Sequence, residues 1–170
     1  MKNSKPHHNV VVLGDFNVKP NSVSGVFMNG QYPEYDRLEI KHEIRSEIVI
    51  KECQKLFERF NFQLFSKFGF LNCYSVYKQF KEGLGQGAIE RWEDGFPEMT
   101  NFTEDFKALI DHIVISTNGM KLVALKELPT VKQAEEFGYI GFPCDEFPSD
   151  HIPLCAELVL KSHVPLIYPV

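Results

Sequence analysis

The feature that most constrains the fold is a short apolar run that ends in a polar turn. Residues 9–14 (Asn-Val-Val-Val-Leu-Gly) are mainly β-branched and apolar, and Asp15-Phe16-Asn17 follows at once. A run that is apolar at consecutive positions is typical of a strand buried on both faces in a layered α/β fold. We therefore expect an α/β (α+β) protein in which Asp15 and Asn17 lie where this buried strand ends.

The rest of the chain divides into short elements. Residues 109–117 and 120–128 resemble strands, and the Asn118-Gly119 pair between them predicts a hairpin. Residues 152–161 alternate between apolar and polar, which predicts a terminal strand. The other expectations are a helix from Ser22 or Ser24 to Gly30, a helix within 42–60, an ambiguous aromatic stretch over 61–77, a long surface loop over 82–101, a helix over 131–137 ended by Gly138, and a second loop over 140–149.

Composition limits the class of protein. The 170 residues are 44% hydrophobic and include 15 Phe, so we expect a single globular domain over 1–170. The formal net charge of −5 excludes a protein held to nucleic acid mainly by its own positive charge. No apolar run approaches the roughly 18 residues of a spanning helix, and residues 1–8 lack the apolar stretch of a signal peptide. We expect no membrane contact.

The cysteines indicate a reducing compartment. No Cys-x-x-Cys pair occurs, and no cysteine has the spacing to histidine that structural zinc sites require. We therefore expect free, mostly buried thiols and a cytoplasmic or nuclear protein. The four are Cys53, Cys73, Cys144 and Cys155.

Three polar signals stand at expected strand ends: residues 14–17 (Gly-Asp-Phe-Asn), 110–113 (Ile-Asp-His-Ile) and 148–151 (Pro-Ser-Asp-His). Strand ends meet at one edge of an α/β sheet, where ligand sites collect. Carboxylates there suit Mg²⁺, and a carboxylate beside the metal can orient a water for attack on phosphorus. His151 can place positive charge on phosphoryl oxygens.

Each signal also has a simpler explanation. An Asp after a strand is most often a turn former, and Ser149-Asp150 is a possible cap. Asp111 is harder to dismiss, because a carboxylate inside an apolar strand needs a partner or a metal. The order of all three signals together favours phosphate-ester chemistry.

This ordered set resembles the endonuclease/exonuclease/phosphatase superfamily, and within it the deadenylases of the nocturnin, Angel and carbon catabolite repressor types. Further stretches resemble that group. They are residues 20–27, the Thr100-Asn101-Phe102-Thr103 and Asp105-Phe106-Lys107 segments, Leu128-Pro129, and residues 147–154. Residues 31–70 carry no specific likeness.

The resemblance implies a 3′–5′ exoribonuclease that acts on poly(A) RNA and uses Mg²⁺ or Mn²⁺. It implies that Asp15 orients or activates the attacking water and that Asn17 contacts the phosphate or the adjacent base. It implies that Asp111 completes the acidic cluster and that Asp150 holds His151, which stabilises charge on the phosphate. The implied metal ligands are Asp15, Asp111 and Asp150.

Phe106 and His112 each have two possible roles. Phe106 lies where the deadenylases carry an aromatic that stacks on a base, and the alternative is an ordinary core phenylalanine. His112 stands where the group usually has Tyr, so it either changes local packing or adds a titrating group near the site.

The resemblance covers the C-terminal half of a four-layer α/β sandwich, with one mixed, mainly antiparallel sheet and helices on its outer face. In the superfamily an N-terminal half supplies an Asn, the main metal-binding Glu and a second His, and we match none of these to a motif here. We expect the inner face of the sheet to be covered by that half, by a partner chain or by a second copy. We expect these 170 residues alone to be weakly active or inactive.

Two alternatives remain open. One is a phosphatase of the same superfamily that acts on a nucleotide or a phosphoinositide, since the chemistry is shared. The other is a non-catalytic half-domain that serves as a binding module.

Overall fold

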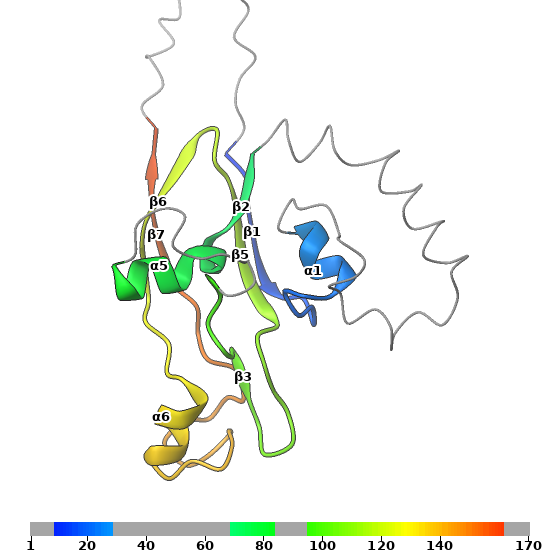
Figure 1. The fold of residues 1–170 in the computed structure, drawn as a ribbon, viewed down its shortest axis with the longest axis vertical. Helices are drawn as coiled ribbons and strands as arrows, with labels where there is room; N and C mark the ends of the chain where they lie inside the picture. Colours follow the sequence, from blue (N-terminus) through cyan, green and yellow to red (C-terminus); the bar gives the residue numbers. More distant parts are fainter. Residues whose placement is uncertain (1–8, 29–68, 84–94, 162–170) are drawn as a thin grey trace, which may run out of the picture.

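The computed structural model describes residues 9–28, 69–83 and 95–161, and Figure 1 shows short strands with few helices. All strand pairs in these residues are antiparallel, which confirms the α+β class. No helix in these ranges is long and apolar enough to cross a membrane. The elements are β1 (Val11–Asp15), α1 (Val23–Met28), β2 (Phe70–Asn72), the 3-10 helix η1 (Cys73–Val76), α5 (Tyr77–Glu82), β3 (Asn101–Phe102), β4 (Lys107–Ala108), β5 (Asp111–Ser116), β6 (Met120–Leu125), α6 (Val131–Glu136) and β7 (Ala156–Leu160).

Strand β5 organises the fold. It pairs with β1 along one edge and with β2 along the other, which gives a three-stranded sheet in the order β1-β5-β2. Strands β6 and β7 form a second antiparallel pair, and β3 and β4 form a third. η1 contacts β2, β5 and β6, and α5 contacts β6, so this helical segment spans strands of two sheets (Figure 1).

The expected hairpin at Asn118-Gly119 is wrong, although both flanking strands exist. β5 and β6 do not pair, because both edges of β5 are already occupied by β1 and β2. The turn instead carries the chain into the second sheet, where the amide of Lys161 donates to the carbonyl of Gly119 at 2.9 Å.

The expectation that β1 is buried on both faces is also wrong. Val11, Val12 and Leu13 are 43%, 44% and 67% exposed. β1 is an edge strand, and the central, covered position belongs to β5, where Val114 and Ile115 are buried. The apolar run correctly predicts a strand, but it does not show which residues, if any, cover that strand.

The core forms around β5, η1 and the segments before β3 and after β6. Its fully buried large side chains include Tyr74, Met99, Phe102, Ile115 and Leu128. Met99 lies in the stretch expected as a surface loop, and residues 95–101 are buried except for one glutamate. That expectation is therefore wrong at the C-terminal end of the loop.

Local signals predicted α1 and α6 but not η1 or α5, since the stretch over 61–77 was ambiguous and no helix was expected after it. The expected end of the first helix at Gly30 lies outside the described residues. The Ser22 Oγ accepts from the amide of Gly25 at 3.1 Å, which caps α1. Thr130 and Gln133 form a capping box at the start of α6, and Gly138 adopts a φ of 87° just after its end. The terminal strand is shorter than expected, because β7 begins only after Pro153, which cannot donate to a ladder.

Three thiols lie in the described ranges, and all are free, as expected. Cys73 is buried, and desolvation raises the pKa of its thiol to about 11. Cys144 is half-buried and Cys155 is exposed, so "mostly buried" is wrong for this set. The helix expected within 42–60 and Cys53 lie outside the described residues.

Candidate active site

The pairing of β1 with β5 brings two carboxylates together. Asp15 ends β1 and Asp111 begins β5, and the two are direct partners in the antiparallel register. Like charges directly opposite each other on neighbouring strands repel, so this pair needs a nearby cation. The structure places one there, His151.

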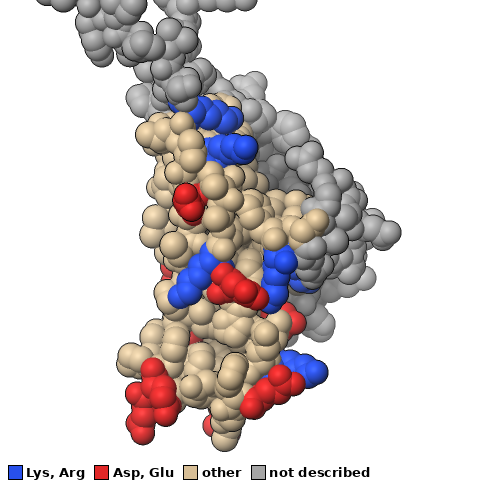
Figure 2. All heavy atoms as spheres, turned by 90° about the vertical axis from the view of Figure 1, so that its left-hand side faces the viewer, with Lys and Arg blue, Asp and Glu red and all other residues tan. Residues whose placement is uncertain are grey.

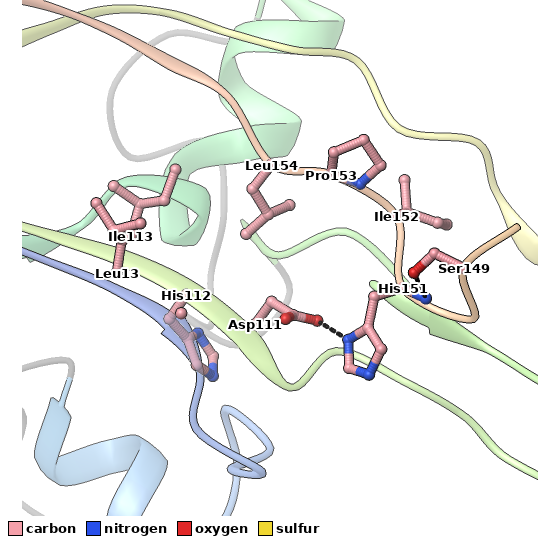
Figure 3. Close-up of a pocket in the computed structure, with 10 residues that line it drawn as sticks. Leu13, Asp111, His112, Ile113, Ser149, His151, Ile152, Pro153 and Leu154 are labelled. Carbon is pink, nitrogen blue, oxygen red and sulfur yellow. Dashed lines mark hydrogen bonds and ion pairs between the residues drawn. The ribbon is translucent and has the colours of Figure 1, made fainter.

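The imidazole of His151 lies among three carboxylates. Its Nδ1 is 2.9 Å from Oδ2 of Asp111, and Figure 3 shows the two side chains pointing toward each other. Its Nε2 lies 4.0 Å from Oδ2 of Asp15 and 3.9 Å from Oδ2 of Asp150. The hydrogen bond to Asp111, aided by the charges of the three carboxylates, raises the pKa of His151. The charged imidazolium is thereby favoured.

This geometry corrects the expected partner of His151. The short bond comes from Asp111, on a different strand, rather than from the adjacent Asp150. The Asp150 carboxylate instead accepts a hydrogen bond from Nδ2 of Asn101 at 3.2 Å.

Backbone hydrogen bonds hold the turn that carries His151 against β3. The amide of Phe102 donates to the carbonyl of Asp150 at 3.0 Å, and the amide of Ile152 donates to the carbonyl of Thr100 at 2.7 Å. The Oγ of Ser149 accepts from the amide of His151 at 3.1 Å. Two bonds from β3 and its neighbour therefore flank His151 and fix its place along the strand.

Thr100 also anchors the start of β5. It is fully buried, and its Oγ1 accepts from the amides of Ile110 at 3.0 Å and Asp111 at 3.1 Å. One residue thus holds both Asp111 and the turn that bears His151. The sequence marked Thr100 and Asn101 only as part of a resemblance and assigned them no role, although two polar residues between buried apolar ones were the available signal.

Asp15 is both a turn former and a member of the cluster. Its Oδ1 accepts from the amide of Asn17 at 2.8 Å, and Nδ2 of Asn17 lies 3.5 Å from its Oδ2. Asn17 adopts a φ of 51°, a left-handed conformation that Asn tolerates better than most residues. The exposed Asn17 side chain lies at the edge of the carboxylate group.

Phe106 is a surface residue. It lies in the turn between β3 and β4, is 42% exposed, and takes no part in the core cluster, so the alternative of a core phenylalanine is wrong. The Nζ of Lys19 lies 5.9 Å from the centroid of its ring. The ring is therefore available to a ligand, with a cation on one side.

The acid–imidazole pair faces a hollow of about 320 Å³. Asp111, His151 and Ser149 line its polar side, and Figure 3 shows Leu13 and Ile113 on the opposite side. The segment 152–154 completes the wall. A polar reactive edge thus meets an apolar wall, an arrangement common in ligand sites.

The described residues contain no group of three or more His, Cys, Asp or Glu side chains arranged to hold a metal ion. Asp15, Asp111 and Asp150 each approach His151 rather than a common point. Their charges outweigh one imidazolium, however, and Mg²⁺ needs only one or two carboxylates because water fills the rest of its shell. The excess of carboxylate charge is compatible with Mg²⁺, and the metal stays a prediction.

No protein-family model matches the chain. It is similar to proteins named CCR4-Not complex 3′-5′-exoribonuclease subunit Ccr4. The one from Saccharomyces cerevisiae is 47% identical over 58 residues, 34% of this chain and 7% of that protein. The Schizosaccharomyces pombe protein is 44% identical over 63 residues, which are 37% of this chain and 9% of that protein. The Aspergillus fumigatus protein is 37% identical over 95 residues, which are 56% of this chain and 13% of that protein. The chain is thus similar to exoribonuclease subunits and spans only a small part of their length.

Proposed function

We propose that the chain carries part of the active site of a Mg²⁺-dependent 3′–5′ exoribonuclease that shortens poly(A) RNA, as a member of the endonuclease/exonuclease/phosphatase superfamily. The observation that carries the proposal is the His151–Asp111 pair, with Asp15 opposite Asp111 in register. The similarity to Ccr4 exoribonuclease subunits supports the reaction class. Cytoplasm or nucleus is the proposed compartment.

In this proposal His151 and Asp111 have complementary tasks. In this proposal Nδ1–H of His151 donates to Asp111, and the raised pKa of His151 favours the imidazolium, which also has a proton on Nε2. This bond fixes the ring and leaves Nε2–H directed toward the space between Asp15 and Asp150. A phosphoryl oxygen placed there receives a charged hydrogen bond as negative charge develops on it.

Asp15 is the residue best placed to act on water. Its carboxylate is 39% exposed, so water reaches it, and its Oδ1 is fixed by the amide of Asn17. The other oxygen can orient a water or take its proton as the water attacks phosphorus. Asn17, beside it, can donate to the phosphate or to the adjacent base.

Mg²⁺ would be held by Asp15, Asp111 and Asp150, with water completing its shell. A bound Mg²⁺ polarises phosphoryl oxygens and lowers the pKa of bound water. The excess of negative charge in the cluster is what makes these residues suitable for it.

One feature favours RNA over a small phosphate ester. The exposed Phe106 ring, with Lys19 beside it, offers a stacking surface for a base. Basic and acidic side chains are interspersed on the face in Figure 2, so the proposal relies on the site rather than on a basic surface there. The exposed apolar β1 would be covered by an N-terminal half, a partner chain or a second copy.

Hydrolysis of a 5′-labelled, A-tailed RNA in Mg²⁺ tests the proposal, with Asp15→Ala and His151→Ala beside the matched control Asp145→Ala, which changes an exposed carboxylate on the 140–147 loop. Because these 170 residues are expected to be weakly active or inactive alone, we expect at most a faint ladder that shortens from the 3′ end. Any such ladder should disappear in the first two variants and persist in Asp145→Ala. A ladder unchanged in Asp15→Ala would refute the assignment. Release of inorganic phosphate from nucleotides would support the phosphatase instead, and RNA binding without product would support a binding module.

A further inference from the structure

His112 lies on the side of β5 opposite Asp111 and is almost fully buried, with 1% of its surface exposed. Its ring packs near Phe16 and Phe96, with centroid distances of 6.1 Å and 6.5 Å. It is also among the residues that line the hollow, and burial lowers its pKa. Of the two roles open to it from the sequence, packing is the one that the structure supports.

Two hydrogen bonds give this ring a single tautomer. Nδ1 lies 2.9 Å from Nδ2 of Asn72, and Nε2 lies 2.6 Å from the carbonyl oxygen of Val18. The Asn72 amide nitrogen can only donate, since its Oδ1 accepts from the amide of Tyr74 at 3.3 Å. Nδ1 of His112 therefore accepts and Nε2–H donates to Val18.

The bond to Val18 closes a clamp on the turn that carries Asp15 and Asn17. On one side of Asn17, the amide of Phe16 donates to the carbonyl of Ile110 at 3.1 Å. On the other side, Val18 is held by His112. Asn17 lies between two bonds to the same region of β5 and adopts the left-handed φ of 51° that lets its amide reach Asp15.

We propose that His112 is a positioning residue that holds Asp15 and Asn17 in place through the carbonyl of Val18. The inference rests on the proposed function for its catalytic consequence, while its structural part stands on the hydrogen bonds alone. A His that only filled space would need neither the correct tautomer nor the bond to Val18.

Two variants separate the bonds. The amide nitrogen of Gln comes close to the place of Nε2, so His112→Gln keeps a donor for Val18 and leaves the Asn72 amide without its acceptor. The shorter Asn keeps an acceptor near the place of Nδ1. His112→Asn therefore keeps the hydrogen bond from the Asn72 amide and loses the hydrogen bond to the Val18 carbonyl. Each variant loses one hydrogen bond of the ring, a buried bond to Asn72 in His112→Gln and a part-buried bond to Val18 in His112→Asn.

The test is the ¹⁵N heteronuclear NOE of Asn17 and Val18 in the full chain, followed by kcat on A-tailed RNA. We expect the NOE of both residues to fall in His112→Asn and to stay at the wild-type value in His112→Gln. We expect kcat of His112→Asn to lie roughly tenfold below that of His112→Gln. Equal NOE values in the two variants would overturn the proposal.

A second measurement uses the wild-type protein and does not depend on how well a variant folds. Long-range ¹H–¹⁵N spectra report which imidazole nitrogen carries the proton, and we expect Nε2–H on a neutral His112. An Nδ1–H tautomer would refute the proposal. If the NOE values differ as expected and no RNA is hydrolysed by the wild type or by either variant, the positioning role stands and only its catalytic consequence is refuted.

Discussion

Thr100→Val gives the sharpest test of how the site is assembled. Valine keeps the shape of threonine but removes the hydroxyl that accepts from the amides of Ile110 and Asp111 at 3.0 Å and 3.1 Å. Thr100 is fully buried, so both amides lose their acceptor where water does not easily replace it. An unsatisfied buried donor costs about 1–3 kcal/mol, so we expect unfolding to be easier by about 2–4 kcal/mol.

Thr103→Val is the matched control. The Thr103 Oγ1 bonds within the exposed turn before Phe106, where water replaces the lost partner, so we expect a cost below about 1 kcal/mol. Urea unfolding with linear extrapolation measures both costs, and hydrogen exchange at the Asp111 amide shows whether the start of β5 loosens. Equal losses of stability in Thr100→Val and Thr103→Val would refute the reasoning.

Four further outcomes are expected at the site. Asp111→Asn should lower the pKa of His151 in metal-free buffer, read by NMR titration of the ring; an unchanged pKa would contradict the role of the hydrogen bond. The pKa of His151 is raised in the folded state, so its stabilising contribution is complete below the unfolded pKa of about 6.5 and is lost as pH rises through the folded pKa. Urea unfolding at a series of pH values should show this loss of stability. The loss should be smaller in Asp111→Asn. Phe106→Ala should weaken RNA binding by about 1–3 kcal/mol, while Phe80→Ala, equally exposed on α5, should not, and equal binding by the two would exclude stacking. Mg²⁺ should shift the amide signals around Asp15 in the wild type and not in Asp15→Asn, and EDTA should reverse the shift; the same shift in both would place the ion elsewhere.

The sequence predicted elements whose signals are local and could not predict what those elements pair with. The cap of α1 at Ser22 and the end of α6 before Gly138 depend on residues only a few positions away, so the sequence predicts them. The sequence also predicts the strands on either side of Asn118-Gly119. It does not predict their pairing, because the partners of β5 are β1 and β2, which lie far away in the chain.

The site shows the same division. Its carboxylates and its imidazole were identified from short motifs, and the hydrogen bond between His151 and Asp111 was not, because it depends on how the 149–152 turn docks on β3. A neighbour in sequence, Asp150, was the natural guess for the partner. Thr100 was assigned no role because its importance lies in the two amides that donate to it. A polar pair between apolar residues marks the position but does not show which groups bond to it.

The exposed position of β1 has a consequence for the order in which the site forms. The Asp111–His151 bond spans 40 residues of chain and belongs to the well-covered part of the fold. Asp15 is separated from Asp111 by far more chain and arrives only when β1 docks on β5, through contacts such as the Val10 amide on the Ser116 hydroxyl 106 residues away. Closing such long loops is slow and entropically costly. We therefore expect the imidazole–carboxylate pair to assemble first, and Asp15, the proposed water-activating carboxylate, to join last and to leave first when the edge strand detaches.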